Sequence, residues 1–322
     1  FRAVLAADPS NEDAYALVKS TDHKVFLEML KAGGSPQQVA KRLLDLSHRS
    51  ETAKSQDEGA IRALVTQAVT DRDFGRRTSA VNQLVASHGE YAVPQLAAYL
   101  GSNDIDSRAN AIIALTRLGD DAVMPLAASL QTGNMMQKRN AASLLGRMGD
   151  ERAVPALLQL AAAGSDAASQ AAAAAAAKLG GSGSAVDAYL ALATKFFHGN
   201  AQTLRNYDGT YTVWSAQDGQ VTGTDVPRFL YSYELAEQAC YDALAADPAS
   251  AKARAMIAVI AFAELAAWDG LSADARADES MAATAAALDG ARALAASTGT
   301  SDLMAALGMA VHKGNRPAAC KQ

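Results

Sequence analysis

The 322-residue sequence predicts an all-α protein, an α-solenoid of short helix pairs with a small β-hairpin inserted after about residue 200. The first observation is a period: glycines that end apolar stretches recur at spacings of 30, 30 and 31 residues, at Gly89, Gly119, Gly149 and Gly180. The second is that prolines follow the first three glycines by five or six residues, at Pro94, Pro125 and Pro155. Two markers in step indicate stacked repeats, because one short helix pair cannot bury its apolar face alone.

Each repeat is predicted to hold a helix A, a tight turn and a helix B. Before Gly119, the residues Ala111, Leu115 and Leu118 fall on one helical face, and the same spacing precedes Gly149 and Gly180. The glycine then takes the left-handed position that ends a helix, and the proline occupies the first turn of the next. Helix B is expected at about 60–70, 91–100, 121–131, 151–162 and 184–195.

The repeats themselves resemble a known family. The strings SRANAIIALTRLGDDAVMPLAASL and KRNAASLLGRMGDERAVPALLQLA are similar to the short HEAT-like repeats of bacterial HEAT-repeat proteins, including phycobilisome lyases. The resemblance covers residues 60–195 and implies the fold, whereas the same repeat serves many scaffolds and implies no particular activity. The run Ala171–Ala177 departs from the pattern, so this unit should lack bulky packing side chains.

A second motif brackets the repeats. The string LAADP occurs at 5–9 and again at 244–248. It resembles the boundary between tetratricopeptide repeats, where a helix ends at Asp-Pro and Ser10 or Asn11 can cap the next. We therefore divide the chain into 1–56 (tetratricopeptide-like helices), 57–195 (HEAT-like solenoid), 196–233 (insertion) and 234–322 (tetratricopeptide-like and Ala-rich helices).

Shorter features complete this division. Ser35-Pro36 is expected to open a helix over 36–48, and the polar residues 49–59 are expected to form a linker. The Ala-rich helices of 271–313 should be interrupted at Gly290 and at 297–302.

The insertion at 196–233 holds 8 of the 18 aromatic residues. Asp218-Gly219 favours a type I′ turn, so the segment should form a β-hairpin. Either the hairpin covers the end of the repeat stack, which is the favoured interpretation, or its aromatic side chains anchor a partner. Strand alternation favours burial for Tyr211 and leaves Trp214 open. The candidate partner-binding residues are Trp214, Tyr211, Tyr207, Arg205, Arg228 and His198.

Charge narrows the classes of partner. The formal net charge of -5 divides into -1 for residues 1–73, +1 for 74–195 and -5 for 196–322. No region is basic enough for nucleic acid, and no apolar run is long enough for membrane insertion. The chain begins at Phe1 within an apparent helix end, so we expect a soluble, processed chain or fragment whose targeting signal would lie outside it.

No catalytic or metal-binding motif emerges from the pattern. The five histidines are scattered, and Cys240 and Cys320 are 80 positions apart. His88 and Cys240 are best explained as packing residues. The sequence therefore predicts a non-enzymatic scaffold without cofactor or metal, which binds another protein or peptide through its concave helix B surface and the insertion. The alternative is a regulatory or lyase-like HEAT protein that holds a chromophore or a modified protein.

Overall fold

The computed structural model describes residues 3, 7–205, 211–278, 281–297, 299, 304 and 308. Most of these residues are helical, and the chain divides into two compact units, Phe1–Gln95 and Leu96–Gln322. The division between the two units falls after Gln95, inside the predicted repeat segment 57–195. The four domains expected from the sequence remain a prediction. None of the helices in the described ranges combines the length and the apolar character needed to cross a membrane.

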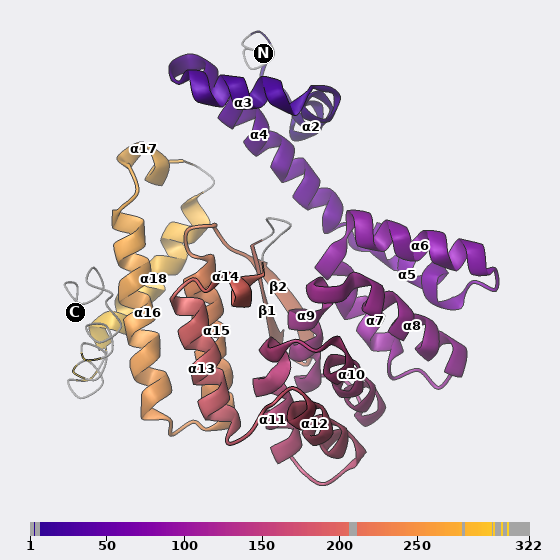
Figure 1. The fold of residues 1–322 in the computed structure, drawn as a ribbon. Helices are drawn as coiled ribbons and strands as arrows, with labels where there is room; N and C mark the ends of the chain where they lie inside the picture. The colour runs from indigo at the N-terminus through magenta and orange to yellow at the C-terminus, as the bar shows by residue number, and fades with distance from the viewer. Residues whose placement is uncertain are drawn as a thin grey trace. The chain divides into compact units, whose positions relative to one another are not determined.

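In the first unit, the helix that ends at Ser55 packs against the two helices before it, and the next two helices pack against each other (Figure 1). Its elements are α2 (Asn11–Ser20), α3 (His23–Ala32), α4 (Gly34–Ser55), α5 (Glu58–Thr70), α6 (Phe74–Ser87) and the 3₁₀ helix η1 (Gly89–Ala92). Helix α7 (Val93–Tyr99) crosses from this unit into the next. Ser10 caps α2 and forms a reciprocal capping box with Asp13, so the predicted cap is confirmed.

The predicted linker at 49–59 is wrong. Helix α4 continues to Ser55 because its polar residues are held by tertiary contacts that the local pattern does not reveal. Ser50 is buried, and two ion pairs tie the end of α4 to α2, from Lys19 to Glu51 and from Lys54 to Glu12. Only Gln56 and Asp57 separate α4 from α5.

The second unit contains three complete helix pairs. The A helices are α8 (Ile105–Leu118), α10 (Met135–Met148) and α12 (Ala167–Lys178). The B elements are η2 (Gly119–Ala122) with α9 (Val123–Ala128) and η3 (Ser129–Gln131), η4 (Glu151–Ala153) with α11 (Val154–Ala162), and α13 (Ala185–Phe197). Helix α10 contacts α8 and α12, and α11 contacts α9 and α13, so neighbouring pairs pack A against A and B against B.

The period predicted these boundaries well. Gly119 and Gly149 have φ of +62° and +83°, a region in which a side chain would be strained, and each ends an A helix. Leu115 and Leu145 are both fully buried, which confirms the expected core face of the A helices.

Helices α10 and α12 approach each other closely. A Cβ atom built on Gly146 would lie 2.8 Å from the Cβ of Ala175, nearer than real side-chain carbons come. Ala172 and Ala176 are also buried on this face of α12. The alanine run therefore has a packing function, because small side chains on both helices permit the short separation.

The predicted hairpin is present. Strands β1 (Thr212–Gln217) and β2 (Gln220–Asp225) pair antiparallel, with Thr212 opposite Asp225 and Gln217 opposite Gln220. Asp218 and Gly219 both have positive φ, as a type I′ turn requires. Strand β1 is largely buried and β2 is largely exposed.

Beyond the hairpin, α15 (Tyr231–Ala246), α16 (Ala251–Asp269) and α18 (Ala282–Ser297) follow one another as packed neighbours, and α15 also lies along α13 (Figure 1). The short helices α14 (Ala201–Leu204) and α17 (Ala273–Arg276) lie in the connections. The LAADP string at 244–248 forms the bend between α15 and α16, with Ser250 as the cap. Gly290 lies inside α18, so the predicted interruption there is wrong.

Candidate functional site

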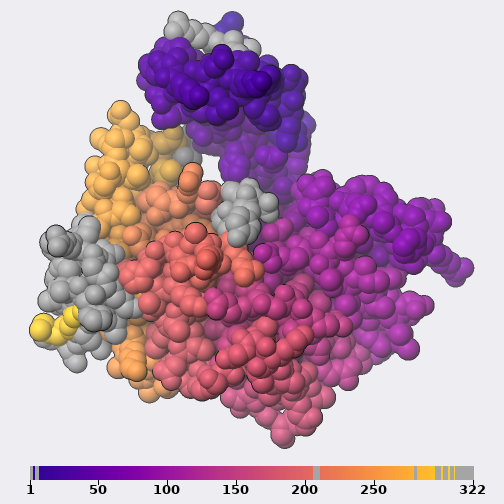
Figure 2. All heavy atoms as spheres, viewed as in Figure 1, coloured from indigo at the N-terminus to yellow at the C-terminus, as the bar shows by residue number. Residues whose placement is uncertain are grey.

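Strand β1 and helix α15 lie against the B side of the second unit's repeats. Strand β1 contacts α9 and α15, and α15 packs along α13. In the space-filling view, the magenta-to-red atoms of the repeats adjoin the orange atoms that follow them in the chain on the face shown (Figure 2). The B elements α9 and α13, part of the surface that the sequence predicted to bind a partner, are therefore covered in part by the chain itself.

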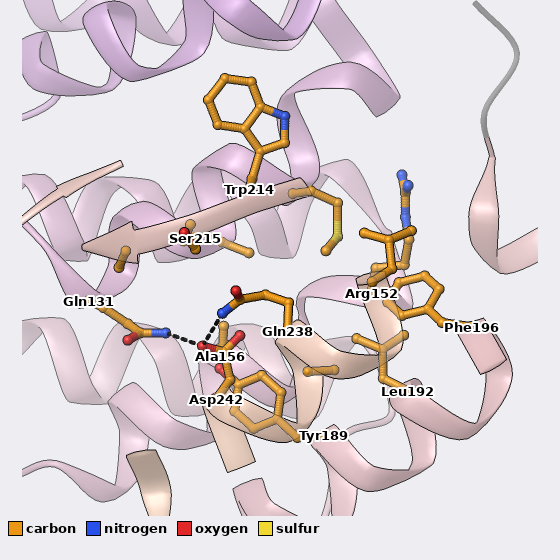
Figure 3. A pocket seen from close by; sticks show the side chains of 16 residues that line it. Gln131, Arg152, Ala156, Tyr189, Leu192, Phe196, Trp214, Ser215, Gln238 and Asp242 are labelled. Atoms are coloured by element: carbon orange, nitrogen blue, oxygen red, sulfur yellow. Dashed lines mark hydrogen bonds between the residues drawn. The ribbon is translucent and has the colours of Figure 1, made fainter. Parts of the chain in front are cut away.

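A small cavity of ≈ 30 Å³ remains under β1. Its polar side is made by Asp242 of α15, which accepts hydrogen bonds from Gln131 Nε2 at 3.3 Å and Gln238 Nε2 at 3.2 Å (Figure 3). Burial raises the pKa of Asp242 to about 6, although these two hydrogen bonds favour its charged form. Tyr189 donates a hydrogen bond to Gln159 at 2.9 Å, and burial, with the charge of Asp242, raises its pKa.

The size of this cavity limits what it can hold. A water needs about 10–15 Å³ of such space, whereas pockets for small molecules and cofactors begin at about 300 Å³. The cavity thus accommodates water molecules around Asp242 and gives no support to a chromophore.

Trp214, whose burial the sequence left open, is buried, whereas Tyr211, for which burial was favoured, is only half-buried. Trp214 is only 6% exposed, and its ring points away from the cavity, on the other side of β1 (Figure 3). A Cβ on Gly223, its cross-strand neighbour, would lie 2.9 Å from the indole ring, so the ring lies over the glycine. Tyr211 is half-buried and makes an edge contact with Tyr231, with ring centroids 5.4 Å apart. Trp214 thus offers little surface to a partner as the structure stands.

Arg205, predicted to contact a partner, is bound within the chain. Its Nη1 lies 3.3 Å from Asp120 Oδ2 and 3.1 Å from Asp150 Oδ2, carboxylates that follow the turn glycines of two successive repeats. Arg152 also binds Asp150, with 2.7 Å between Nη2 and Oδ2, and both of these side chains are buried. Burial alone would raise the pKa of Asp150, but the hydrogen bonds and charge of Arg152, aided by Arg205, hold it below the usual value.

The remaining candidates are dispersed. His198 ends α13 in an exposed position and contacts Phe197 edge to face, with centroids 5.5 Å apart. Arg228 is exposed after β2. Tyr207 lies outside the described residues. His88, by contrast, is buried as expected, with Nδ1 3.0 Å from the carbonyl oxygen of Ser55, and Cys240 is buried as expected.

The structure also brings together a group that the sequence reasoning missed. Glu234 and Glu237 of α15 meet Glu264 of α16, and one carboxylate oxygen from each lies within 4.8 Å of the others. Burial, followed by the charges of the neighbouring glutamates, raises the pKa of Glu264 to about 9 and that of Glu234 to about 7. The available signal was Glu264 itself, a charged residue in the apolar stretch AMIAVIAFAELAAW.

Comparison with known protein families identifies the central segment. Residues 93–178, from α7 to the end of α12, match the family model of HEAT repeats. The helix pairs described above thus include HEAT repeats. No curated protein matches the sequence.

Proposed function

We propose that this protein is a non-enzymatic scaffold that binds another protein or peptide through the outward side of its A helices. HEAT repeats generally mediate interactions between proteins, which supports the general class. In this proposal the helix pairs belong to a solenoid with tetratricopeptide-like flanks, and the hairpin closes the B side. The surface expected to bind the partner therefore moves from the B helices to the A helices.

A recurring exposed residue carries the proposal. The first residue of three successive A helices is a large apolar one, directly after an Asp or Asn cap: Phe74 is 75% exposed, Ile105 70% and Met135 56%. Ile113, also on α8, is 58% exposed. Single exposed apolar residues are ordinary. Within the second unit, however, Ile105 and Met135 share one repeat position and are both exposed, which helix packing does not require and which is typical of a contact surface. Phe74 holds the same position in the first unit.

In this proposal the aromatic insertion contributes fewer contacts to the partner than the A helices do. His198 and Arg228 are exposed, so both are accessible to a partner. The near-neutral charge of the repeats favours a protein over nucleic acid, and we expect no duplex binding at physiological salt. The chromophore-holding alternative draws no support from the small cavity under β1.

The test is a quantitative comparison of variants. A partner would first be captured by cross-linking in the source organism and identified, and its affinity for the purified protein then measured. Ile105→Glu combined with Met135→Glu should weaken binding at least about 30-fold, the equivalent of about 2 kcal/mol at a binding hot spot. The free energy of unfolding should change by no more than about 0.5 kcal/mol, because both side chains are exposed.

Leu27→Glu is the matched control, since Leu27 is 54% exposed but lies on α3, outside the recurring position. It should leave the affinity unchanged. Equal binding by the double variant and the wild type would reject the A-helix surface. If Arg228→Ala alone abolished binding, the insertion rather than the A helices would be the contact site.

A further inference from the structure

The second unit contains a carboxylate cluster between two neighbouring helices. Glu234 and Glu237 are three residues apart on α15, which places them on one face of that helix. Glu264 reaches the same point from α16, which packs against α15. Since one oxygen of each lies within 4.8 Å of the others, the three side chains converge on one small volume.

Glu264 is the most unusual member. Its side chain is 3% exposed, and Oε1 has no hydrogen-bond partner within the chain. The residues before it on α16, 255–263, are all buried and apolar. A buried carboxylate without a partner is costly, so an oxygen in this position calls for a positively charged or hydrogen-bonding group that the described residues do not provide.

Within the described part of the chain, no cation fills that role. Among the described residues, no lysine or arginine forms an ion pair with any of the three glutamates. The one side-chain hydrogen bond recorded in the cluster comes from Tyr241, whose hydroxyl donates to Glu237 Oε1 at 3.1 Å. The cluster thus combines several acidic oxygens, and none of the described residues supplies a compensating charge.

We propose that Glu234, Glu237 and Glu264 bind a divalent metal ion of the hard, oxygen-preferring class, with Ca²⁺ as the best match. All three donors are carboxylates, and hard cations favour such oxygen ligands. Glu234 and Glu237 are half-buried, so the ion can enter from solvent and complete its coordination with water. The proposal does not depend on the A-helix surface or its partner.

The donor chemistry favours Ca²⁺ over Mg²⁺. Mg²⁺ requires a near-ideal octahedron and keeps several of its waters, whereas Ca²⁺ accepts irregular geometry and more carboxylate oxygens. The three oxygens, all within 4.8 Å of one another, can converge on one such ion. Carboxylates can also bind Ca²⁺ through both oxygens, so three of them supply much of its shell of six to eight ligands.

Tyr241 is assigned as a positioning residue in this site. Its hydroxyl holds one oxygen of Glu237, which limits rotation of that carboxylate and leaves the other oxygen for the ion. Tyr241→Phe should weaken Ca²⁺ binding a few-fold while the stoichiometry stays at one ion. An unchanged affinity would remove this role from Tyr241.

The test uses the full chain after chelation and dialysis, titrated with CaCl₂ by calorimetry and followed by thermal melting. One Ca²⁺ should bind with a dissociation constant of about 1 mM or tighter, the range of weak calcium sites in proteins. The melting temperature should rise with Ca²⁺ concentration, because the ion binds the folded state. MgCl₂ and MnCl₂ serve as comparison titrants.

Variants locate the site. Glu264→Gln keeps the size of the side chain and removes its charge, so it should fold, lose at least ten-fold in Ca²⁺ affinity and lose the shift in melting temperature. Glu151→Gln is the control, because Glu151 is exposed and remote in sequence from the cluster. It should bind Ca²⁺ as the wild type does.

Three results would overturn the proposal. If the wild type binds none of the three cations at millimolar concentration, the cluster is a set of protonated glutamates only. If Glu264→Gln binds Ca²⁺ as tightly as the wild type, the ion lies elsewhere. Tighter binding of Mg²⁺ or Mn²⁺ than of Ca²⁺ would overturn the choice of ion.

Discussion

Asp150 and Glu264 are equally buried carboxylates with opposite surroundings. Their side chains are 2% and 3% exposed, respectively. Asp150 is held by Arg152 and Arg205, and its pKa is lowered. Glu264 faces Glu234 and Glu237, and its pKa is raised to about 9.

The comparison separates the effect of burial on a carboxyl pKa from the effect of neighbouring charges. Removal from water acts on both carboxyls in the same direction, towards the neutral form. Two guanidinium groups reverse that tendency at Asp150, whereas neighbouring carboxylates reinforce it at Glu264. The first carboxylate therefore stabilises the junction between repeats, and the second is strained whenever it is ionised without a cation.

The largest effect is expected from removing the partner of Asp150. Arg152→Met keeps the length of the side chain but leaves a buried carboxylate with only Arg205, so the free energy of unfolding should fall by about 3–5 kcal/mol. Urea denaturation at pH 7 measures this loss. Arg76→Met is the control. Arg76 forms an ion pair with Asp71, but its side chain is 66% exposed, so the loss of this pair should cost no more than about 1 kcal/mol. Similar losses in both variants would mean that burial of the pair at Asp150 has no special weight.

Trp214 is a buried side chain without charge, and it serves as the reference for the two buried carboxylates. Trp214→Ala should lower the free energy of unfolding by about 3–5 kcal/mol, by nearly the same amount at pH 5 and pH 9. In a Trp268→Phe background, which isolates Trp214, acrylamide should quench the fluorescence only weakly. Strong quenching, or a melting temperature unaffected by Trp214→Ala, would restore the view of Trp214 as an exposed anchor.

Glu264 should make the protein less stable at high pH. Its pKa is higher in the folded protein, about 9, than its usual value of 4.5, so the folded state binds more protons between those limits. Stability is then full below about pH 4.5 and declines as pH rises towards 9. In chelator, Glu264→Gln should be more stable than the wild type at pH 9 by at least about 1.4 kcal/mol, the equivalent of a single pKa unit. The two proteins should converge near pH 5, and parallel pH profiles would contradict the raised pKa.

Asp242 tests an intermediate case, a buried carboxyl whose partners are neutral amides. Its pKa of about 6 against a usual 3.8 places the loss of stability between about pH 4 and pH 6. Asp242→Asn should remove that step and raise stability at pH 7 by at least about 1.4 kcal/mol, the equivalent of one pKa unit. Carboxyl chemical shifts of Asp242 through a pH titration provide a direct check, and a midpoint near 4 would show that the two glutamines suffice to keep it charged.

Arg205 should give the smallest change. Its side chain is 31% exposed and Arg152 continues to neutralise Asp150, so Arg205→Gln should cost up to about 1 kcal/mol. The difference from wild type should shrink between 0.1 M and 1 M NaCl, because exposed charges are screened. A loss as large as that of Arg152→Met would assign equal weight to the two arginines.

The sequence predicted the features that depend on local chemistry. Turn glycines such as Gly119 and Gly149 and the Asp218-Gly219 dipeptide require particular backbone angles, so their positions can be recognised without knowing the fold. The capping of α2 by Ser10 is local for the same reason. The helix pairs followed from the period of these signals.

The features it missed depend on distant contacts. Arg205 binds Asp120 from 85 residues away, and Glu264 meets Glu234 only because α15 and α16 pack together. The polar sequence at the end of α4 predicted a linker, because the ion pairs that join this end to α2 are tertiary contacts that the local sequence does not reveal. The sequence favoured a hairpin that covers the end of the repeat stack, but the contacts of β1 with α9 and of α15 with α13 depend on residues far apart in the chain.

The close approach of Gly146 to Ala175 also constrains how this sequence can evolve. A single methyl group added at position 146 would collide with the methyl group of Ala175, so the first substitution alone separates two helices. The two positions should therefore vary together among relatives, with a larger residue at 146 accompanied by glycine at 175. Drift along the alanine run is limited at buried positions such as Ala172 and Ala176, whereas exposed alanines of α12 are free to change.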